Sequence, residues 1–254
     1  MLHHKVFGTG QPLVILHGLF GMLDNWKTLA RQWAENYQVI LVDLPNHGRS
    51  PHVDEFSYAG MADAVVELIE HLELPPVYLM GHSMGGKAAM QLALDRNDLV
   101  AKLIVVDMAP RQYRRGHDDV FSALQAFDPA EVSDRKEAAR LMAAYVSDPG
   151  IQLFLLKNLA RNPAGGYQWR MNLPVITAQY ENLIGPVGNF GDSFTGPALF
   201  LRGGRSGYVR DEDLDYIHDL FPAATLATVE GAGHWVHAER PEELSSLVTN
   251  FLAT

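Results

Sequence analysis

Several features that mark other classes of protein are missing from this chain of 254 residues. It contains no cysteine, which excludes both a disulfide framework and a thiolate zinc site. It contains no run of about 18 consecutive apolar residues, the length that a membrane-spanning helix requires. The N-terminal segment MLHHKVFGTG lacks the apolar core of a signal peptide. We therefore expect a cytoplasmic protein that does not insert into a membrane.

Positive charge is also scarce in this sequence. Lysine and arginine total 20 against 30 aspartates and glutamates, and the net charge is −10. Because the basic residues form no cluster, neither a nucleic acid nor an anionic membrane surface is expected as a partner. Hydrophobic residues make up 47% of the chain, which is typical of a globular protein with a sizeable core. The composition leaves the oligomeric state open.

A glycine-rich turn joins a short apolar run to a helix-forming stretch in the segment VYLMGHSMGGKAAM, residues 77–90. Gly81, Ser83 and Gly85 form the G-x-S-x-G pattern of a nucleophile elbow. The two glycines let strand and helix pack closely, while the serine takes a strained backbone conformation that exposes its hydroxyl. We therefore predict that Ser83 is a nucleophile, which requires a histidine base, a carboxylate and donors for the oxyanion.

The same segment also fits a second motif. Gly81, Gly86 and Lys87 have the spacing of a phosphate-binding P-loop, which would indicate a nucleotide hydrolase. A P-loop places a serine or threonine next to hold magnesium, but Ala88 stands at that position and has no hydroxyl. Two alternatives to a serine hydrolase therefore stay open: a P-loop nucleotide hydrolase, and a non-catalytic protein that binds a small molecule.

Short apolar runs alternate with helical periodicity over most of the chain. The runs predict buried strands at residues 13–16, 38–42, 77–80, 102–106, 198–201 and 225–229. Helical patterns lie between them, at residues 25–36, 57–72, 84–95, from about residue 211, and at residues 241–252. This alternation predicts an α/β fold with a mostly parallel central sheet and helices on both faces.

The alternation of apolar runs and helical patterns stops between Arg111 and Ser193. Helical patterns there follow one another at residues 118–127, 133–146, 151–159 and 173–183, with breaks at prolines and glycines. Because no convincing strand separates them, we predict a helical cap at residues 111–193, inserted into a core formed by residues 1–110 and 194–254. The cap could be a lid that shapes an acyl pocket and excludes water, or it could serve packing alone.

The groups that a serine nucleophile needs stand in loops after predicted strands. The loop HGLFG follows the run at residues 13–16, so Leu19 N–H is predicted as one oxyanion donor. Met84 N–H, the first after the nucleophile, is the other. His234 follows the last predicted strand beside a glycine and is predicted as the base. We expect His47 and His237 to be held by local hydrogen bonds instead.

These motifs resemble those of the α/β-hydrolase superfamily over nearly the whole chain. Within this superfamily, three segments have a sequence similar to that of bacterial YbfF-type esterases, namely HGLFG (17–21), GKA (86–88) and GAGHWVHAE (231–239). The resemblance implies hydrolysis of a small-molecule carboxylic ester or acyl thioester, acyl-CoA included, without a cofactor or a metal. A serine at the elbow argues against the dehalogenase and epoxide hydrolase branches.

The acid of the expected triad is displaced in this sequence. The superfamily usually carries it after the strand predicted at residues 198–201, but Ser206 stands where an aspartate is expected. Some branches keep the acid after the preceding strand, so we assign it to Asp107, which could otherwise only cap its loop. Asp211 and its acidic neighbours at 212–213 have the pattern of an exposed first helical turn, so we expect them to be solvated.

The predicted cap carries scattered arginines, namely Arg111, Arg114, Arg115, Arg161 and Arg170. They could hold the phosphates of an acyl-CoA, or could simply form solvated surface. The acyl chain length and the choice between ester and thioester stay open.

Overall fold

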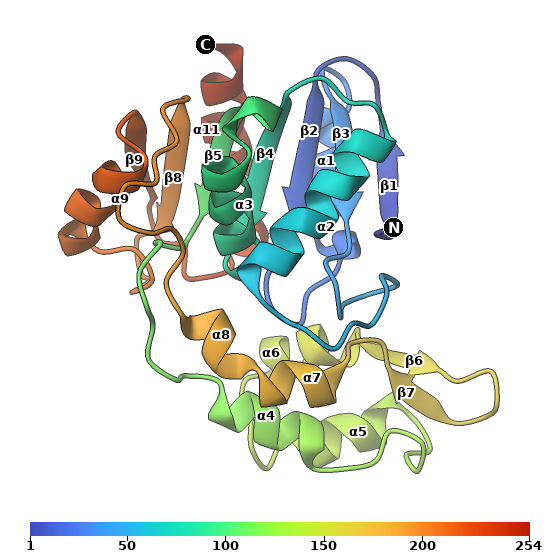
Figure 1. Cartoon of the computed structure of the whole chain (residues 1–254). Helices are drawn as coiled ribbons and strands as arrows, with labels where there is room; N and C mark the ends of the chain where they lie inside the picture. Colours follow the sequence, from blue (N-terminus) through green and yellow to red (C-terminus); the bar gives the residue numbers. More distant parts are fainter.

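The computed structural model describes residues 1–254 and builds them around one sheet (Figure 1). Its strands are β1 (His4–Phe7), β2 (Pro12–Leu16), β3 (Gln38–Val42), β4 (Val77–His82), β5 (Val100–Val106), β8 (Ala198–Gly203) and β9 (Ala224–Val229). Their spatial order is β1-β3-β2-β4-β5-β8-β9. Only β1 runs antiparallel to its neighbour. The predicted α/β fold with a mostly parallel sheet is confirmed.

Helices cover both faces of this sheet. On one face lie α2 (Tyr58–His71), α3 (Met84–Asp95) and α9 (Leu214–Leu220), whose buried side chains belong to the larger apolar cluster. On the other lie α1 (Lys27–Trp33), which follows a 3₁₀ turn at Leu23–Trp26, and α11 (Pro241–Ala253). The short helix α10 (Val236–Glu239) precedes α11. None of the helices has the length and apolar character needed to cross a membrane.

Alternate residues of a strand serve the two faces. In β2, Val14 and Leu16 join the larger apolar cluster, while Leu13 and Ile15 join the smaller one. All five residues of β2 are buried. A strand covered on both faces has no polar position, which is why its sequence is a continuous apolar run.

Between β5 and β8 the chain leaves the sheet and builds a smaller layer beside it (Figure 1). We call residues 111–193 the insertion. Its helices are α4 (Asp118–Gln125), α5 (Arg135–Met142), α6 (Pro149–Leu156), α7 (Leu173–Ala178) and α8 (Tyr180–Ile184). The prediction that no strand occurs here is wrong, because β6 (Leu159–Arg161) and β7 (Tyr167–Trp169) form an antiparallel hairpin. Three residues per strand are too few to show an alternating pattern.

Candidate active site

Ser83 occupies the turn between β4 and α3, with φ of 53° and ψ of −121°. A positive φ of this size is a backbone conformation that residues other than glycine rarely adopt. A Cβ on Gly81 would lie 2.0 Å from the carbonyl oxygen of Gly85, and a Cβ on Gly85 would lie 2.5 Å from that of His17. Both positions therefore need glycine, and strand and helix meet as closely as the elbow pattern predicts.

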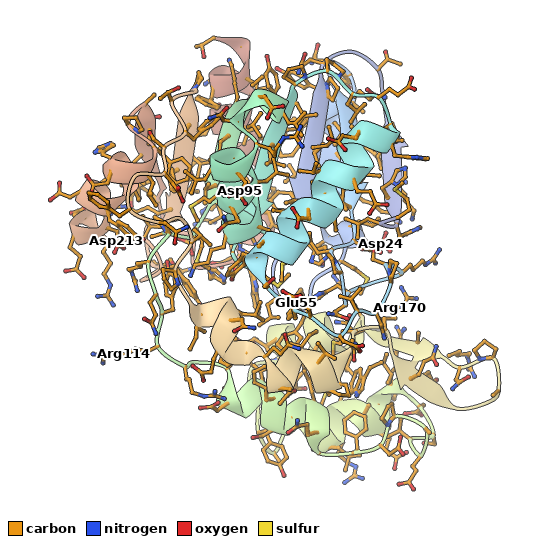
Figure 2. All side chains as sticks on the ribbon, in the orientation of Figure 1. Asp24, Glu55, Asp95, Arg114, Arg170 and Asp213 are labelled. Carbon is orange, nitrogen blue, oxygen red and sulfur yellow. The ribbon has the colours of Figure 1, made fainter.

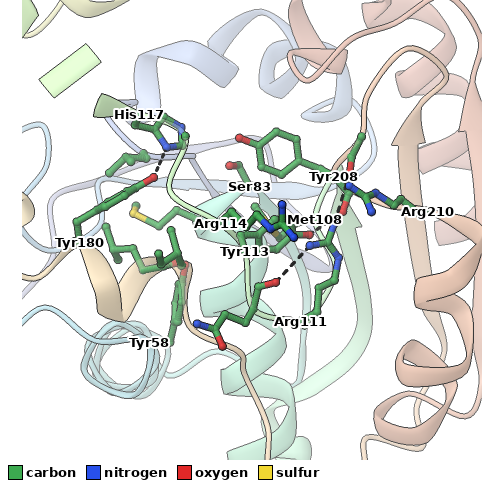
Figure 3. A pocket seen from close by; sticks show the side chains of 17 residues that line it. Tyr58, Ser83, Met108, Arg111, Tyr113, Arg114, His117, Tyr180, Tyr208 and Arg210 are labelled. Atoms are coloured by element: carbon green, nitrogen blue, oxygen red, sulfur yellow. Dashed lines mark hydrogen bonds between the residues drawn. The ribbon is translucent and has the colours of Figure 1, made fainter. Parts of the chain in front are cut away.

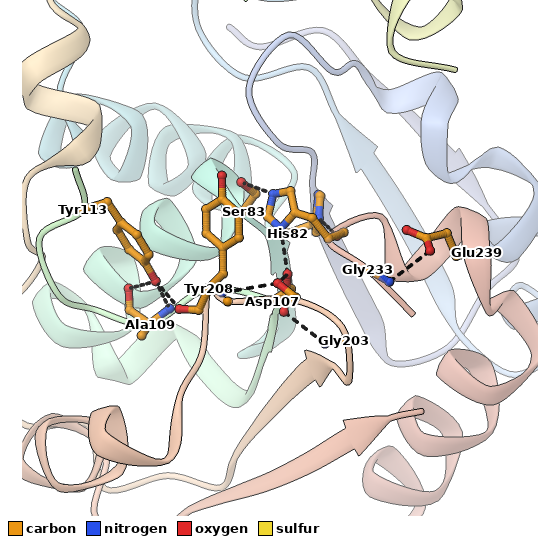
Figure 4. A network of polar contacts seen from close by, with 12 residues as sticks. His82, Ser83, Asp107, Ala109, Tyr113, Gly203, Tyr208, Gly233 and Glu239 are labelled. Atoms are coloured by element: carbon orange, nitrogen blue, oxygen red, sulfur yellow. Dashed lines mark hydrogen bonds and ion pairs between the residues drawn. The ribbon is translucent and has the colours of Figure 1, made fainter. Parts of the chain in front are cut away.

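The side chain of His234 lies between a hydroxyl and a carboxylate. Its Nε2 is 3.0 Å from Ser83 Oγ, and its Nδ1 is 2.7 Å from Asp107 Oδ2. Figure 4 labels Ser83 and Asp107 and draws the polar contacts around them as dashed lines. The structure thus brings together the three residues assigned to the triad, from loops that follow β4, β5 and β9. Glu239 fixes the loop of His234 by accepting the N–H of Gly233 at 3.0 Å.

Asp107 is fully buried and receives several hydrogen bonds. The N–H of Gly203 donates to Oδ1 at 3.0 Å, and the hydroxyl of Ser206 donates to Oδ2 at 2.5 Å. The last residue of β8 and the loop after it, which carries Ser206 where an aspartate was expected, therefore supply donors to an acid that follows the neighbouring strand β5.

Two aromatic side chains that the sequence analysis did not single out pack around His234. The ring of Tyr208 stacks on the imidazole with centroids 3.9 Å apart and an interplanar angle of 17°. His82 Nε2–H donates to the carbonyl oxygen of His234 at 2.8 Å. The place of His82 inside the elbow motif could have indicated a role near the nucleophile, whereas Tyr208 has no local signal.

Buried histidines join the loops below the nucleophile. His17 Nε2 accepts the N–H of Leu44 at 3.0 Å, and His47 Nε2 accepts the N–H of Phe20 at 3.1 Å. Burial lowers the pKa of His17 to about 4 and that of His47 to about 3, so both rings are neutral at pH 7. Burial also holds the pKa of His82 well below its usual value. The predicted local hydrogen bond of His47 is confirmed by its Nδ1–H, which donates to the carbonyl of Pro45.

The corresponding prediction for His237 is wrong. Its Nδ1 is buried without a hydrogen-bond partner. The ring instead stacks on Trp26, with centroids 4.6 Å apart, and lies 5.0 Å from the ring of His82. Aromatic packing from distant elements replaces the local polar contact, and the spacing of residues along the chain does not reveal it.

The predicted oxyanion donors both lie beside Ser83. Leu19 N–H donates no hydrogen bond to another protein group. Met84 is the first residue of α3, so its N–H has no partner within the helix. Leu19 and Met84 line the same cavity as Ser83. Two free N–H groups next to a nucleophile can receive a negatively charged oxygen.

A cavity of about 520 Å³ opens beside Ser83 (Figure 3). The insertion contributes much of its wall, including Tyr113, His117, Tyr180 and Leu183. Tyr180 and His117 are joined by a hydrogen bond of 2.5 Å between the hydroxyl and Nδ1. We call this space the larger cavity.

A second space of about 80 Å³ lies on another side of Ser83. We call it the smaller cavity. His234, Trp235 and Phe154 line it, and none of them lines the larger cavity. Leu19, Ser83 and His117 line both. The nucleophile therefore stands where two subsites meet.

Only some of the predicted phosphate-binding arginines lie at the larger cavity. Arg111 and Arg114 line it, and Arg210 joins them from the loop after β8 (Figure 3). Arg161 and Arg170 do not line it, and Arg170 lies on the opposite side of the molecule from Arg114 (Figure 2).

Carboxylates neutralise several basic groups near this cavity. Arg115 pairs with Asp118 and Glu181 instead of facing the cavity. Arg111 Nε lies 2.8 Å from Asp213 Oδ1. The expectation that Asp213 is solvated is therefore wrong, because its contact with Arg111 holds it in a buried position. Asp211 is exposed as expected, with 83% of its side chain accessible.

Lys87 does not face the space beside Ser83. Its ammonium group donates to the carbonyl oxygens of Arg111 and Gly185. This geometry does not suit a P-loop, whose lysine reaches a bound phosphate. No group of three or more histidine, aspartate or glutamate side chains is arranged to hold a metal ion.

Comparison with known proteins agrees with this architecture. Residues 11–241 match a family model described as the alpha/beta hydrolase fold. "Esterase YbfF" of Escherichia coli is 37% identical over 246 residues, which cover 95% of this chain and 92% of the relative. "sn-1-specific diacylglycerol lipase ABHD11" of Mus musculus is 40% identical over 249 residues, which cover 95% of this chain and 80% of the relative. A solved structure named "Marine microorganism esterase" superposes with a TM-score of 0.96 at 39% identity, covering 98% of both chains.

Proposed function

Because this chain belongs to the α/β-hydrolase fold family and is a carboxylesterase, we propose that it cleaves esters through an acyl-enzyme on Ser83. One observation carries the proposal. The two nitrogens of His234 lie 3.0 Å from Ser83 Oγ and 2.7 Å from Asp107 Oδ2. That arrangement lets one imidazole accept a proton from a hydroxyl while a buried carboxylate stabilises the resulting charge.

In the proposed first step, His234 Nε2 takes the proton of Ser83 as Oγ attacks the ester carbonyl carbon. Asp107 holds the Nδ1–H tautomer and stabilises the imidazolium. The N–H groups of Leu19 and Met84 stabilise the oxyanion, and each is expected to lower the barrier by about 3 kcal/mol. His234 then returns the proton to the departing alkoxide. A water molecule, deprotonated by the same nitrogen, attacks the acyl-enzyme, and His234 returns this proton to Ser83 Oγ as the bond to the acyl carbon breaks and the acid is released.

The two cavities support different roles for the two parts of the ester. The leaving oxygen must come within hydrogen-bond reach of His234 Nε2, which delivers its proton. His234 lines the smaller cavity only. The alcohol part is therefore assigned to the smaller cavity and the acyl chain to the larger one. Under this assignment the insertion is a lid whose side chains select the acyl group.

A second candidate is hydrolysis of acyl-CoA thioesters. Arg114 favours it because it brings positive charge to the larger cavity, where Arg111 and Arg210 are paired with Asp213 and Glu212. Hydrolysis of CoA thioesters would require the long thiol part to occupy this cavity, with the acyl part on the side of His234. We favour simple esters as substrates. With the acyl chain in the larger cavity, the alcohol part lies next to His234, which donates the proton that this leaving group needs.

Initial rates on a matched substrate series test both candidates. We expect turnover of p-nitrophenyl esters and of methyl octanoate, with chain-length dependence, and slower turnover of octanoyl-CoA. Loss of all these activities in Ser83→Ala, with an unchanged fold by circular dichroism, would support the acyl-enzyme. Faster turnover of octanoyl-CoA that falls in Arg114→Ala would favour the thioester candidate. Tight binding of magnesium-ATP, or ester cleavage by Ser83→Ala at the parent rate, would contradict both.

A further inference from the structure

Lys87 has no part in the proposed proton transfers, yet its side chain is fully buried four positions after the nucleophile. A buried ammonium group is unfavourable unless its donors are satisfied. Desolvation, followed by the nearby charge of Arg111, lowers the pKa of Lys87 to about 7. An apolar residue would fill this space without that cost, so the contacts of the ammonium group need an explanation.

Those contacts reach the two places where the chain passes between the sheet and the insertion. Lys87 Nζ donates to the carbonyl oxygen of Arg111 at 2.8 Å, and also to that of Gly185. Arg111 is the first residue of the insertion, on its way out from β5. Gly185 directly follows α8, the last helix before the return to the sheet. We call these two connecting segments, at Arg111 and Gly185, the crossings. One side chain on α3 thus donates hydrogen bonds to both crossings.

A backbone hydrogen bond also joins the two crossings directly to one another. Tyr113 N–H donates to the carbonyl of Ile184 at 2.7 Å. The ring of Tyr113 has its centre 4.8 Å from Lys87 Nζ, and the ring of Tyr58 lies at 5.6 Å. A cation is attracted to the faces of aromatic rings at these distances. Lys87 is therefore the common neighbour of two backbone segments and two rings.

The groups held in this way form a wall of the larger cavity, because Tyr58, Arg111, Tyr113 and Ile184 all line it. We propose that Lys87 is a positioning residue whose ammonium group fastens both crossings of the insertion to α3 and thereby sets the shape of the larger cavity. This inference rests on the proposed assignment of the acyl chain to that cavity. It gives Lys87 a role in substrate selection and none in the proton transfers.

Lys87→Met tests the proposal, since methionine keeps the volume but donates no hydrogen bond. Without the donor, the backbone carbonyls of Arg111 and Gly185 lose their partner and the wall is free to shift. We expect KM for p-nitrophenyl octanoate to rise about tenfold, while KM for the acetate and kcat for both esters change by less than about threefold. Labelling of Ser83 by a fluorophosphonate should proceed at nearly the parent rate.

Lys102→Met is a matched control on β5. Lys102 Nζ also donates to two backbone carbonyls, those of Phe251 and Leu252, at 3.0 and 3.2 Å. It also lies 5.4 Å from each of two ring centres, Tyr78 and Phe251. These contacts fasten α11, which does not border the larger cavity. We expect this variant to keep the parent ratio of octanoate to acetate KM.

A purely structural role gives a different result. If Lys87→Met lowers the melting temperature but leaves the KM ratio at the parent value, or if it changes both esters equally, the proposal is overturned. Should that variant fail to fold, Lys87→Gln takes its place, because the shorter glutamine side chain cannot reach both carbonyls, and hydrogen exchange provides the readout. Faster exchange at Tyr113, Gly185 and Val187, but not in α11, supports the proposal; unchanged exchange overturns it. Absence of fluorophosphonate labelling in the parent protein would instead refute the acyl-enzyme itself.

Discussion

The sheet and the insertion supply the site with different kinds of side chain. From the loops after β4, β5 and β9 come Ser83, Asp107 and His234, polar groups whose partners are fixed by hydrogen bonds of 2.7 and 3.0 Å. From the insertion come mixed aromatic, aliphatic and basic side chains such as Tyr180 and Leu183. The sheet therefore carries the proposed chemistry, while the insertion, with its short helices and hairpin, offers surface for selecting a substrate.

The largest effect is expected where the sheet carries the proposed acid. Asp107→Asn should keep the fold but lower kcat by about 10⁴-fold, the magnitude known for the corresponding change in the protease triad. An amide cannot stabilise the imidazolium and favours the wrong tautomer of His234. Steady-state kinetics with p-nitrophenyl acetate measure the loss. Asp211→Asn is the control, because that side chain is exposed and should matter little. An inactive Asp211→Asn beside an active Asp107→Asn would move the acid to the loop after β8.

Acid should weaken the sheet part through its neutral buried histidines. His17 has a folded pKa of about 4 against about 6.5 in an unfolded chain, so the unfolded state binds the extra proton between these values. Its contribution to stability is present above pH 6.5 and is lost as pH falls toward 4. The full loss is about 3 kcal/mol for this one side chain. Urea unfolding between pH 7 and 4 measures the slope. His17→Gln should flatten the slope, and an unchanged slope would contradict the assignment.

A matched pair of leucines separates selection from packing in the insertion. Leu183 and Leu156 are 6% and 5% exposed, but only Leu183 lines the larger cavity. Both alanine variants should lose about 2–5 kcal/mol of stability, since each truncates a buried leucine side chain. Leu183→Ala alone should shift the preference between butyrate and octanoate esters, by about 30-fold. Equal preferences in the two variants would reduce the insertion to a packing element.

The smallest effect concerns the position where an aspartate was expected. Ser206→Ala removes one of the donors to Asp107 and should lower kcat about tenfold, which corresponds to a loss near the lower end of the about 1.5–3 kcal/mol that a hydrogen bond to a charged group contributes. Steady-state kinetics with p-nitrophenyl acetate measure the loss, and an unchanged melting temperature distinguishes a role in holding Asp107 from a role in packing. A loss as large as that of Asp107→Asn would show that Ser206 has a greater part than the geometry gives it.

The two regions also differ in how well the sequence predicts them. Strands such as β2 are buried on both faces, so an uninterrupted apolar run identifies them, and the G-x-S-x-G spacing reflects a close contact between Gly81 and Gly85. The insertion obeys weaker local rules, and its three-residue strands β6 and β7 leave no periodic signal.

Contacts between distant parts of the chain account for the remaining differences. Asp213 is buried because Arg111, far away in sequence, lies beside it. The stacking of Tyr208 on His234 likewise joins residues that are far apart in the sequence. The same is true of the hydrogen bond that Ser206 donates to Asp107. No propensity or spacing encodes which residues meet across a sheet edge. The choice of Asp107 combines the strand that it follows with the family resemblance, because some branches of the superfamily keep their acid at that position.

The most direct test is to find which serine becomes covalently modified. Treating the protein with a fluorophosphonate and mapping its peptides by mass spectrometry identifies the activated hydroxyl. The account predicts one phosphonyl group per chain, on Ser83, and almost no modification in His234→Ala, where the base is missing. Modification of another serine, or equally rapid labelling of Ser83 without His234, would contradict it.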